Sequence, residues 1–276
     1  MPEGPEIRRA ADRLAKAIAG EIAEEVFFAF DHLRDYADEL SGRRVEAVDN
    51  RGKALLTRFD VGLTVYTHNQ LYGRWFVTAR GTTPRTRRSL RFAVHTADKS
   101  AWLYSASEIA VLESNDLRAH PYLAKLGPDV SAGALDPSVV RERLRDDRFD
   151  GRQLAALYLD QGFLAGLGNY LRAEILFHAR VHPRERPKAL EAKELRKLAD
   201  STVEICRRAY VQRGVTLPSR TAARLRRGGA RRSEKRFYVY GRAGKPCRRC
   251  DAPIRREDIG GRHVYFCPSC QALKGG

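Results

Sequence analysis

The stretch CRRCDAPIRREDIGGRHVYFCPSC, residues 247–270, contains two Cys-x2-Cys pairs separated by sixteen residues. Each pair can present two thiolates from one tight turn, and four thiolates at this spacing match a tetrahedral zinc site. Because protein fills all four positions, such a site holds structure and performs no chemistry. Two disulfides or a redox pair are the alternatives. The pattern favours one structural Zn²⁺ bound by Cys247, Cys250, Cys267 and Cys270.

The rest of the composition indicates a reducing compartment. Of five cysteines in 276 residues, only Cys206 lies outside this stretch, and on an expected helix it is best interpreted as a buried apolar residue. Cysteines this few and this clustered are not typical of a secreted disulfide scaffold. The sequence has no run of eighteen apolar residues, and its N-terminus carries Glu3 and Glu6 in place of a basic, apolar leader. We therefore expect a cytoplasmic protein without a membrane span.

The positive charge lies almost entirely in the second half of the chain. Residues 1–130 hold 19 Lys and Arg against 18 Asp and Glu, whereas residues 131–276 hold 32 against 16 and so carry nearly all of the net +17. This asymmetry indicates that the C-terminal half of the chain binds a polyanion, with nucleic acid as the first candidate. A solvated basic surface is the alternative, and charge alone does not decide between them.

Hydrophobic patterning predicts two different architectures along the chain. Residues 3–18 have the apolar spacing of an amphipathic helix that ends near Gly20. Short β-branched and aromatic runs follow and predict an antiparallel sandwich or barrel. These runs are residues 54–59, 63–68, 75–78, 90–96 and 101–104.

Beyond Pro128 the period becomes helical. Asp136 and Pro137 predict a helix start, and helical patterns cover residues 139–144, 153–159, 170–177 and 191–213. Residues 213–236 hold nine Lys and Arg against one Glu and are expected to form a mobile basic loop. Residues 237–240 and 264–266 are expected to form short strands that bracket the cysteines, and a cationic β-ribbon between the cysteine pairs could contact phosphate or serve solubility alone.

The N-terminus offers a reactive amine. Removal of Met1, favoured by the small second residue, would expose Pro2 as a secondary amine with a useful neutral fraction at physiological pH. Such an amine can attack an aldehyde-level carbon and form a cationic iminium. Glu3 and Glu6 follow at the expected helix start and could supply a general acid. Taken alone, a capped, acidic first turn is the simpler interpretation.

Five separated motifs resemble those of the formamidopyrimidine-DNA glycosylase and endonuclease VIII family, in the family's order. Gly4 and the triplet 70–72 place the resemblance in the endonuclease VIII branch. The motifs are MPEGPEI (1–7), RGKALL (51–56), NQLYG (69–73), GLGNY (166–170) and the four-cysteine finger. The resemblance covers the whole chain and implies an α+β multidomain fold. That fold combines an N-terminal antiparallel β-sandwich with a flanking helix (1–124), a helical helix-two-turn-helix domain (130–225) and a β-hairpin zinc finger (238–272).

The resemblance also implies catalytic roles. Pro2 corresponds to the nucleophile that attacks C1′ and forms a Schiff base, Glu3 to the proton donor for ring opening, and Glu6 to a supporting carboxylate. Lys53 corresponds to the residue that donates a proton in β-elimination and contacts phosphate, although an ordinary surface lysine would be expected without the other motifs. Arg262, counted back from the third cysteine, corresponds to the hairpin arginine that assists δ-elimination.

DNA contacts are implied in the same way. A damaged base must leave the duplex to be reached, and an apolar wedge with a stacking ring can fill the gap. Gln70, Leu71 and Tyr72 are suited to this, with burial of the last two at a strand end as the alternative. Lys125 and Asn169 correspond to phosphate contacts, although Asn169 could act purely as a helix N-cap.

Together these patterns predict a monomeric DNA glycosylase and abasic-site lyase. It would excise oxidised pyrimidines from double-stranded DNA, cut by β,δ-elimination and need one structural Zn²⁺. Glycosylase action on oxidised purines such as 8-oxoguanine, and a noncatalytic zinc-finger protein that binds nucleic acid, are the alternatives.

Overall fold

The computed structural model describes residues 2–131, 135–229, 231 and 234–274. The chain divides into two compact units. Unit 1 comprises Met1–Pro2 and Glu6–Lys125, and unit 2 comprises Glu3–Pro5 and Leu126–Gly276. Within the described part, no helix combines the length and the apolar character needed to cross a bilayer.

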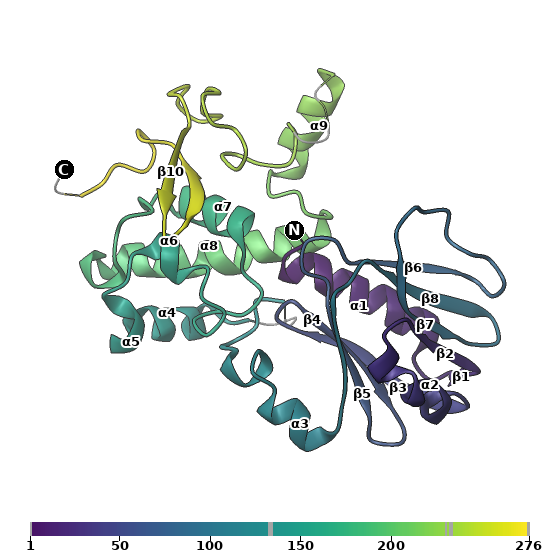
Figure 1. Ribbon diagram of the computed structural model, residues 1–276. Coiled ribbons are helices and arrows are strands. Elements are labelled where there is room, and N and C mark those ends of the chain that lie inside the picture. The colour runs from purple at the N-terminus through teal and green to yellow at the C-terminus, as the bar shows by residue number, and fades with distance from the viewer. Residues whose placement is uncertain (1, 132–134, 230, 232–233, 275–276) are drawn as a thin grey trace. The chain divides into compact units, whose positions relative to one another are not determined.

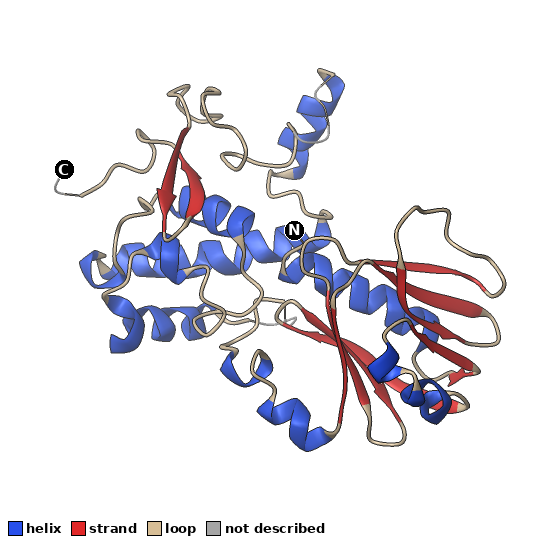
Figure 2. Cartoon of the chain, viewed as in Figure 1, coloured by secondary structure: helices blue, strands red, loops and turns tan. Residues whose placement is uncertain are grey.

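Unit 1 contains two antiparallel sheets (Figures 1 and 2). The first has the order β1-β3-β4-β5-β9, with bounds Ile22–Ala23, Arg43–Arg51, Ala54–Phe59, Thr64–His68 and Glu108–Leu112. The second has the order β2-β7-β8-β6, with bounds Glu25–Phe28, Leu90–His95, Lys99–Tyr104 and Arg74–Ala79. The expected antiparallel sandwich is confirmed.

One hydrophobic core serves both sheets and helix α1 (Gly4–Ile18). The helix contributes Ile7, Leu14 and Ile18, spaced so that they fall on a single face. In β2, Val26 and Phe28 are buried while the alternate residues face solvent, as a half-buried strand requires. The predicted N-terminal helix is confirmed, and its apolar face packs against the core of the sandwich.

The sequence patterns missed several elements of unit 1. Strands β1, β2, β3 and β9 were not among the expected runs; β1 and β2, with two and four residues, are too short for a clear period, whereas β3 has nine residues. Also missed were the short helices η1 (Asp31–Leu33), α2 (Asp35–Leu40), α3 (Ser114–Ala119) and η2 (Leu123–Lys125). Segments this short have little intrinsic stability and are set by tertiary packing.

Unit 2 is helical with one two-stranded hairpin (Figure 2). Its helices are α4 (Pro137–Arg145), α5 (Asp147–Asp150), α6 (Leu154–Leu157), α7 (Asn169–Ala179), η3 (Pro187–Ala189), α8 (Ala192–Val211) and α9 (Ser219–Arg227). The hairpin pairs β10 (Arg255–Ile259) with β11 (Arg262–Phe266). As predicted, Asp136 caps α4: its carboxylate accepts from the Ser138 N–H at 2.6 Å.

Helix α7 forms the centre of unit 2. Nine of its eleven residues are buried, including the charged Arg172 and Glu174. It packs against α8 and against β11 of the finger. Charged residues in so buried a helix need specific partners, because an unpaired buried charge is very costly.

Two expectations for the C-terminal part were wrong. Residues 213–236 are not simply a loop, because α9 occupies Ser219–Arg227; residues 230 and 232–233 of this segment lie outside the described part. Residues 237–240 do not form a strand. The N–H groups of Tyr238, Val239 and Tyr240 instead donate to the buried carboxylate of Glu174 at 2.8 to 3.0 Å. These groups therefore have hydrogen-bond acceptors without pairing to a neighbouring strand.

Candidate active site and metal centre

The four finger cysteines converge on one point. Their sulfur atoms all lie within 4.8 Å of one another, with Sγ to Sγ distances of 3.9 Å for Cys247 and Cys270, 3.4 Å for Cys250 and Cys267, and 3.5 Å for Cys250 and Cys270. Zinc to sulfur bonds of about 2.3 Å in a tetrahedron place sulfurs roughly 3.8 Å apart. The donor set therefore fits one structural Zn²⁺.

The backbone around the cysteines is arranged for a metal. The N–H groups of Arg249 and Cys270 each lie 3.4 Å from the sulfur of the cysteine that opens their own pair. The side chain of Gln271 accepts from the Cys267 N–H and donates to the Val181 carbonyl, at 3.0 and 2.9 Å. This amide therefore links the finger to the loop after α7.

The hairpin of the finger presents a cationic tip. Gly260 and Gly261 connect β10 to β11 with φ of 63° and 73°, and two positive φ values are what the tight hairpin turn of type I′ requires. Arg262 opens β11 directly after this turn and is exposed. The predicted cationic β-ribbon is therefore present, with Arg262 at its end.

Glu3 caps the N-terminus of α7. Its two carboxylate oxygens accept from the N–H groups of Tyr170 at 2.9 Å and Leu171 at 3.2 Å. The first N–H groups of a helix lack intrahelical partners and attract negative charge. Glu3 is buried, so the carboxylate is held in one position by the helix that it caps.

Glycines allow this close approach. A Cβ on Gly168 would lie 2.4 Å from the Glu3 carboxyl carbon, and a Cβ on Gly4 would lie 3.0 Å from the Gly166 Cα. The Gly4 N–H donates to the Gly166 carbonyl at 2.7 Å. Gly4 and Gly166, one from each of the two glycine-bearing motifs, thus meet backbone to backbone within unit 2.

Asn169 does not act as the N-cap that the alternative interpretation assigned to it. Gly168 occupies the N-cap position, and the Asn169 side chain accepts from Arg172 and hydrogen-bonds Tyr240. Arg172 also donates to the Ala155 carbonyl at 2.7 Å and to the His263 carbonyl at 2.9 Å. One buried guanidinium thus links Asn169 to the finger hairpin.

Sequence reasoning missed Arg172, although its signal was present. An arginine in the apolar run Tyr170–Phe177 has no solvated face to occupy and should have suggested a buried charge with fixed partners. Burial lowers the pKa of Arg172 to about 10, an effect that the Glu3 carboxylate opposes and that the charge of Arg262 reinforces. The three charged side chains are therefore electrostatically coupled in unit 2.

Lys53 lies in a tight turn of unit 1. Gly52 and Lys53 connect β3 to β4, with φ of 59° at Gly52, the first central position, where a type II′ turn needs glycine. The Lys53 N–H donates to the Tyr122 hydroxyl at 2.8 Å. The lysine thus precedes β4 as a turn residue, a rigid mounting for its ammonium group.

The turn of residues 69–73, which connects β5 to β6, is exposed at its three central residues, 70–72. Leu71 and Tyr72 are 59% and 68% exposed, so their burial at a strand end is wrong. Gln70 has φ of 45°, an uncommon value for a residue other than glycine, and its amide donates to Glu108 at 3.0 Å. A Cβ on Gly73 would lie 2.7 Å from the Asn69 backbone, so the turn requires glycine there.

The sequence also did not predict an interacting pair, His68 and Glu108, next to this turn. His68 Nδ1 is 3.8 Å from a Glu108 carboxylate oxygen, and burial together with the charge of Lys53 lowers the pKa of His68 despite that carboxylate. Glu108 also bonds Gln70 and the Tyr66 hydroxyl, the latter at 3.1 Å. Gln70 therefore hydrogen-bonds Glu108, and the charges of Lys53 and Glu108 act on the same histidine, His68.

The remaining predicted residues occupy accessible positions. Pro2 is half-buried, and Met1 lies outside the described residues. Glu6 lies in the first turn of α1 and is half-buried. Lys125 ends η2 and is exposed.

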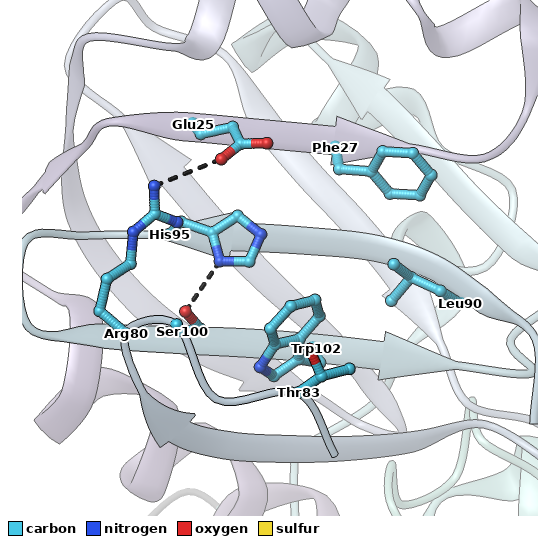
Figure 3. A pocket seen from close by; sticks show the side chains of 9 residues that line it. Glu25, Phe27, Arg80, Thr83, Leu90, His95, Ser100 and Trp102 are labelled. Carbon is cyan, nitrogen blue, oxygen red and sulfur yellow. Dashed lines mark hydrogen bonds and ion pairs between the residues drawn. The ribbon is translucent and has the colours of Figure 1, made fainter. Parts of the chain in front are cut away.

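A separate hollow of about 560 Å³ lies on the outward face of the β2-β7-β8-β6 sheet (Figure 3). Its polar part holds the pair Glu25 and Arg80, 3.3 Å apart, and the contact of His95 Nδ1 with Ser100 Oγ at 2.8 Å. Its apolar part is lined by Phe27, Leu90 and Trp102. None of the predicted site residues lines this hollow.

Three family matches cover most of the chain. Residues 1–107 match the formamidopyrimidine-DNA glycosylase N-terminal domain, and residues 126–220 match the formamidopyrimidine-DNA glycosylase H2TH domain. Residues 244–273 match the zinc finger found in FPG and IleRS. The order of the three matches is that of the two architectures and the finger described above.

Whole-chain comparisons agree with these matches. The chain is 47% identical over 271 residues to proteins named Endonuclease 8 from Escherichia coli and Shigella sonnei, covering 98% of this chain and 100% of theirs. Lactococcus lactis FPG, solved with DNA that contains Fapy-dG, superimposes with a TM-score of 0.79 at 24% identity over 99% of this chain and 100% of that one. A MutM complex with DNA that contains carbocyclic 8-oxo-G gives the same values. At this identity the two structures establish the fold alone.

Proposed function

The chain belongs to the formamidopyrimidine-DNA glycosylase and endonuclease VIII family of base excision repair, whose members are DNA glycosylases and abasic-site lyases, and we propose that it excises oxidised pyrimidines from duplex DNA. The observation that carries the substrate class is the 47% identity to Endonuclease 8 over the whole chain, against 24% to the FPG structures. Oxidised purines are the second candidate, because the fold is shared with FPG bound to Fapy-dG DNA.

Pro2 performs the nucleophilic step in this proposal. Once Met1 is removed, the proline nitrogen attacks C1′ of the damaged nucleotide, and the bond between C1′ and the base breaks. Opening of the sugar ring then breaks the bond between C1′ and O4′, with a proton delivered to O4′, and leaves an iminium between Pro2 and C1′. Glu3 is the proposed donor of that proton, and its capping contacts at α7 fix the carboxyl group for the transfer.

The iminium makes strand cleavage feasible. It withdraws electrons from C1′, so loss of a proton from C2′ expels the 3′ phosphate in β-elimination, and a second elimination expels the 5′ phosphate. Lys53 serves the first elimination from its rigid turn, and Arg262 assists the second from the tip of the finger hairpin. Both cations also stabilise the departing phosphates.

Binding groups surround this chemistry. Leu71 and Tyr72, exposed on the 69–73 turn, enter the duplex where the damaged nucleotide has left it, and Gln70 faces the base that has lost its partner. Asn169, oriented by Arg172, and Lys125 contact backbone phosphates. The zinc supplies no reaction step; its four thiolates hold the hairpin that carries Arg262.

The proposal includes a monomeric protein without a membrane partner, acting in the cytoplasm on nucleoid DNA with a damaged base or an abasic site. It also includes functional domains at 1–124, 130–225 and 238–272. The matched domains and the net charge of +17 support DNA as the partner.

Borohydride trapping tests the proposal. Duplexes that contain dihydrouracil, thymine glycol or 8-oxoguanine are incubated with the protein and reduced, and the covalent adduct is quantified. We expect an adduct mainly on the pyrimidine lesions that Pro2→Ala abolishes and that Pro84→Ala, a change in the loop between β6 and β7, retains. An adduct mainly on 8-oxoguanine would assign the second candidate. No adduct on any lesion, from protein with a processed N-terminus and bound zinc, would reject both.

A further inference from the structure

Helix α9 carries three arginines on one face. Arg220, Arg224 and Arg227 follow at i, i+4 and i+7, the spacing that aligns side chains along one side of a helix. They line a shallow, open hollow of about 420 Å³ together with Thr221 and Ala223. The helix contains no acidic residue, so its arginine face is uniformly positive.

The charges of this face are not neutralised within the described part of the chain. None of the three guanidinium groups forms an ion pair or a side-chain hydrogen bond there, whereas Arg207 and Arg208 of the preceding helix both pair with Glu204. Arg224 also acts electrostatically on Arg248, whose pKa is lowered first by burial and further by this like charge, against the raising effect of Glu174 and Glu234. Arg248 therefore adds one like charge to the surroundings of Arg224.

Packing contributes little to α9. None of its nine residues, all of them described, is buried; Thr221, Ala222, Ala223 and Leu225 are half-buried and the other five are exposed. An isolated helix of this length is marginal in water because nucleation is costly, and like charges three and four residues apart destabilise it further. A polyanion that lies along the arginine face would convert this repulsion into attraction and stabilise the helix.

We infer that α9 is a binding site for the phosphodiester backbone of duplex DNA, engaged independently of sequence and of the lesion, and most helical when occupied. The inference rests on the proposed function, because a DNA repair enzyme supplies the polyanion. The seven helical steps from Arg220 to Arg227 span about 10 Å of helix axis. One DNA strand rises about 3.4 Å along the duplex axis per phosphate, so this length covers about three phosphate steps, enough for each of the three arginines to meet its own phosphate. Guanidinium forks suit phosphate oxygens, and contacts with the backbone carry no sequence information.

Salt dependence of binding to undamaged DNA tests the inference. The affinity for an undamaged duplex is measured between 50 and 200 mM salt for the wild type, for R220Q/R224Q/R227Q and for R220K/R224K/R227K. The control variant R34Q/R43Q/R145Q removes the same charge from exposed arginines elsewhere. Bound zinc and the thermal midpoint establish that each variant is folded. Hydrogen exchange of residues 219–227, with and without the duplex, reports the helix itself.

The expected result is a slope of log K against log salt that is smaller by about 2 to 3 in the glutamine variant, since each phosphate contact contributes about 0.9. The lysine variant should keep most of the slope, the control should change it by less than one, and DNA should slow exchange in α9. A slope change below one in the glutamine variant, or an equal fall in the control, would overturn the inference.

The two proposals fail separately. If the wild type traps no lesion but the glutamine variant still loses slope, the α9 site stands and the catalytic proposal falls. If trapping on lesions succeeds and the slope is unchanged, the catalytic proposal stands and the α9 site falls.

Discussion

The N-terminus of α7 and the 69–73 turn both carry proposed site residues, but these residues are buried at α7 and exposed on the turn. At α7, Glu3 and Arg172 are buried and held by main-chain partners from several segments of unit 2. On the turn, Leu71 and Tyr72 are exposed and project from a backbone strained at Gln70. A group that reacts must be held in one place, whereas a group that enters DNA must be exposed before it binds. Substitutions at α7 should therefore affect stability and chemistry together, and substitutions on the turn should affect DNA processing alone.

Gly168→Ala should produce the largest effect. The new Cβ would lie 2.4 Å from the Glu3 carboxyl carbon, so Glu3 must leave the α7 N-terminus and lose two hydrogen bonds. We expect single-turnover excision to fall by about 100-fold or more, as for a displaced catalytic group, and the free energy of unfolding to fall by about 1 to 3 kcal/mol.

Gly151→Ala is the matched control for that experiment. Its Cβ would meet only the Lys188 Nζ, at 4.0 Å, and Gly151 has a right-handed helical backbone that alanine adopts readily. Stopped-flow excision and denaturant unfolding are measured on both variants. Full activity in Gly168→Ala would show that Glu3 can act from elsewhere and would remove the distinction between the two regions.

Leu71→Ala should separate binding from stability. Because the side chain is 59% exposed, its loss should change the free energy of unfolding by less than about 0.5 kcal/mol. Excision under subsaturating conditions should fall by about 10-fold, since the vacated stack is no longer filled. Val211→Ala, which truncates a side chain that is 62% exposed at the end of α8, controls for loss of exposed apolar surface. Equal excision by the two variants would contradict the role assigned to the turn.

The smallest expected effect is on the pH dependence of stability, through His178 in unit 2. Burial, with Arg208 and Arg249 nearby, lowers the pKa of His178 to about 4, well below its ordinary value of about 6.5. Between pH 6.5 and 4, His178 is therefore protonated in the unfolded chain but neutral in the folded chain. Stability that is present above pH 6.5 is lost as the pH falls toward 4. The thermal midpoint of the wild type should fall as the pH is lowered from 6.5 to 4, and His178→Gln should reduce this fall by a few degrees. An unchanged slope between pH 6.5 and 4 would exclude His178 as the cause.

Local patterns predicted the regular elements well. The run at residues 54–59 coincides with β4, and the cap at Asp136 is observed, because apolar alternation and capping depend on neighbours in sequence. The strand expected at residues 237–240 failed for the opposite reason. Its N–H groups are satisfied by Glu174, more than sixty residues earlier in the chain, and no local pattern reports such a partner.

The candidate site divides in the same way. Residue types at short spacing identified the four zinc ligands and a reactive amine at Pro2, because metal affinity and nucleophilicity belong to the thiolates and the amine themselves. The role of that amine and the 69–73 motif followed from the resemblance to the family. Only the tertiary structure revealed that Glu3 caps a helix 167 residues further along the chain and that Arg172 joins Asn169 to the finger hairpin. These contacts exist because buried charges and free helix N–H groups must find partners wherever the fold brings them.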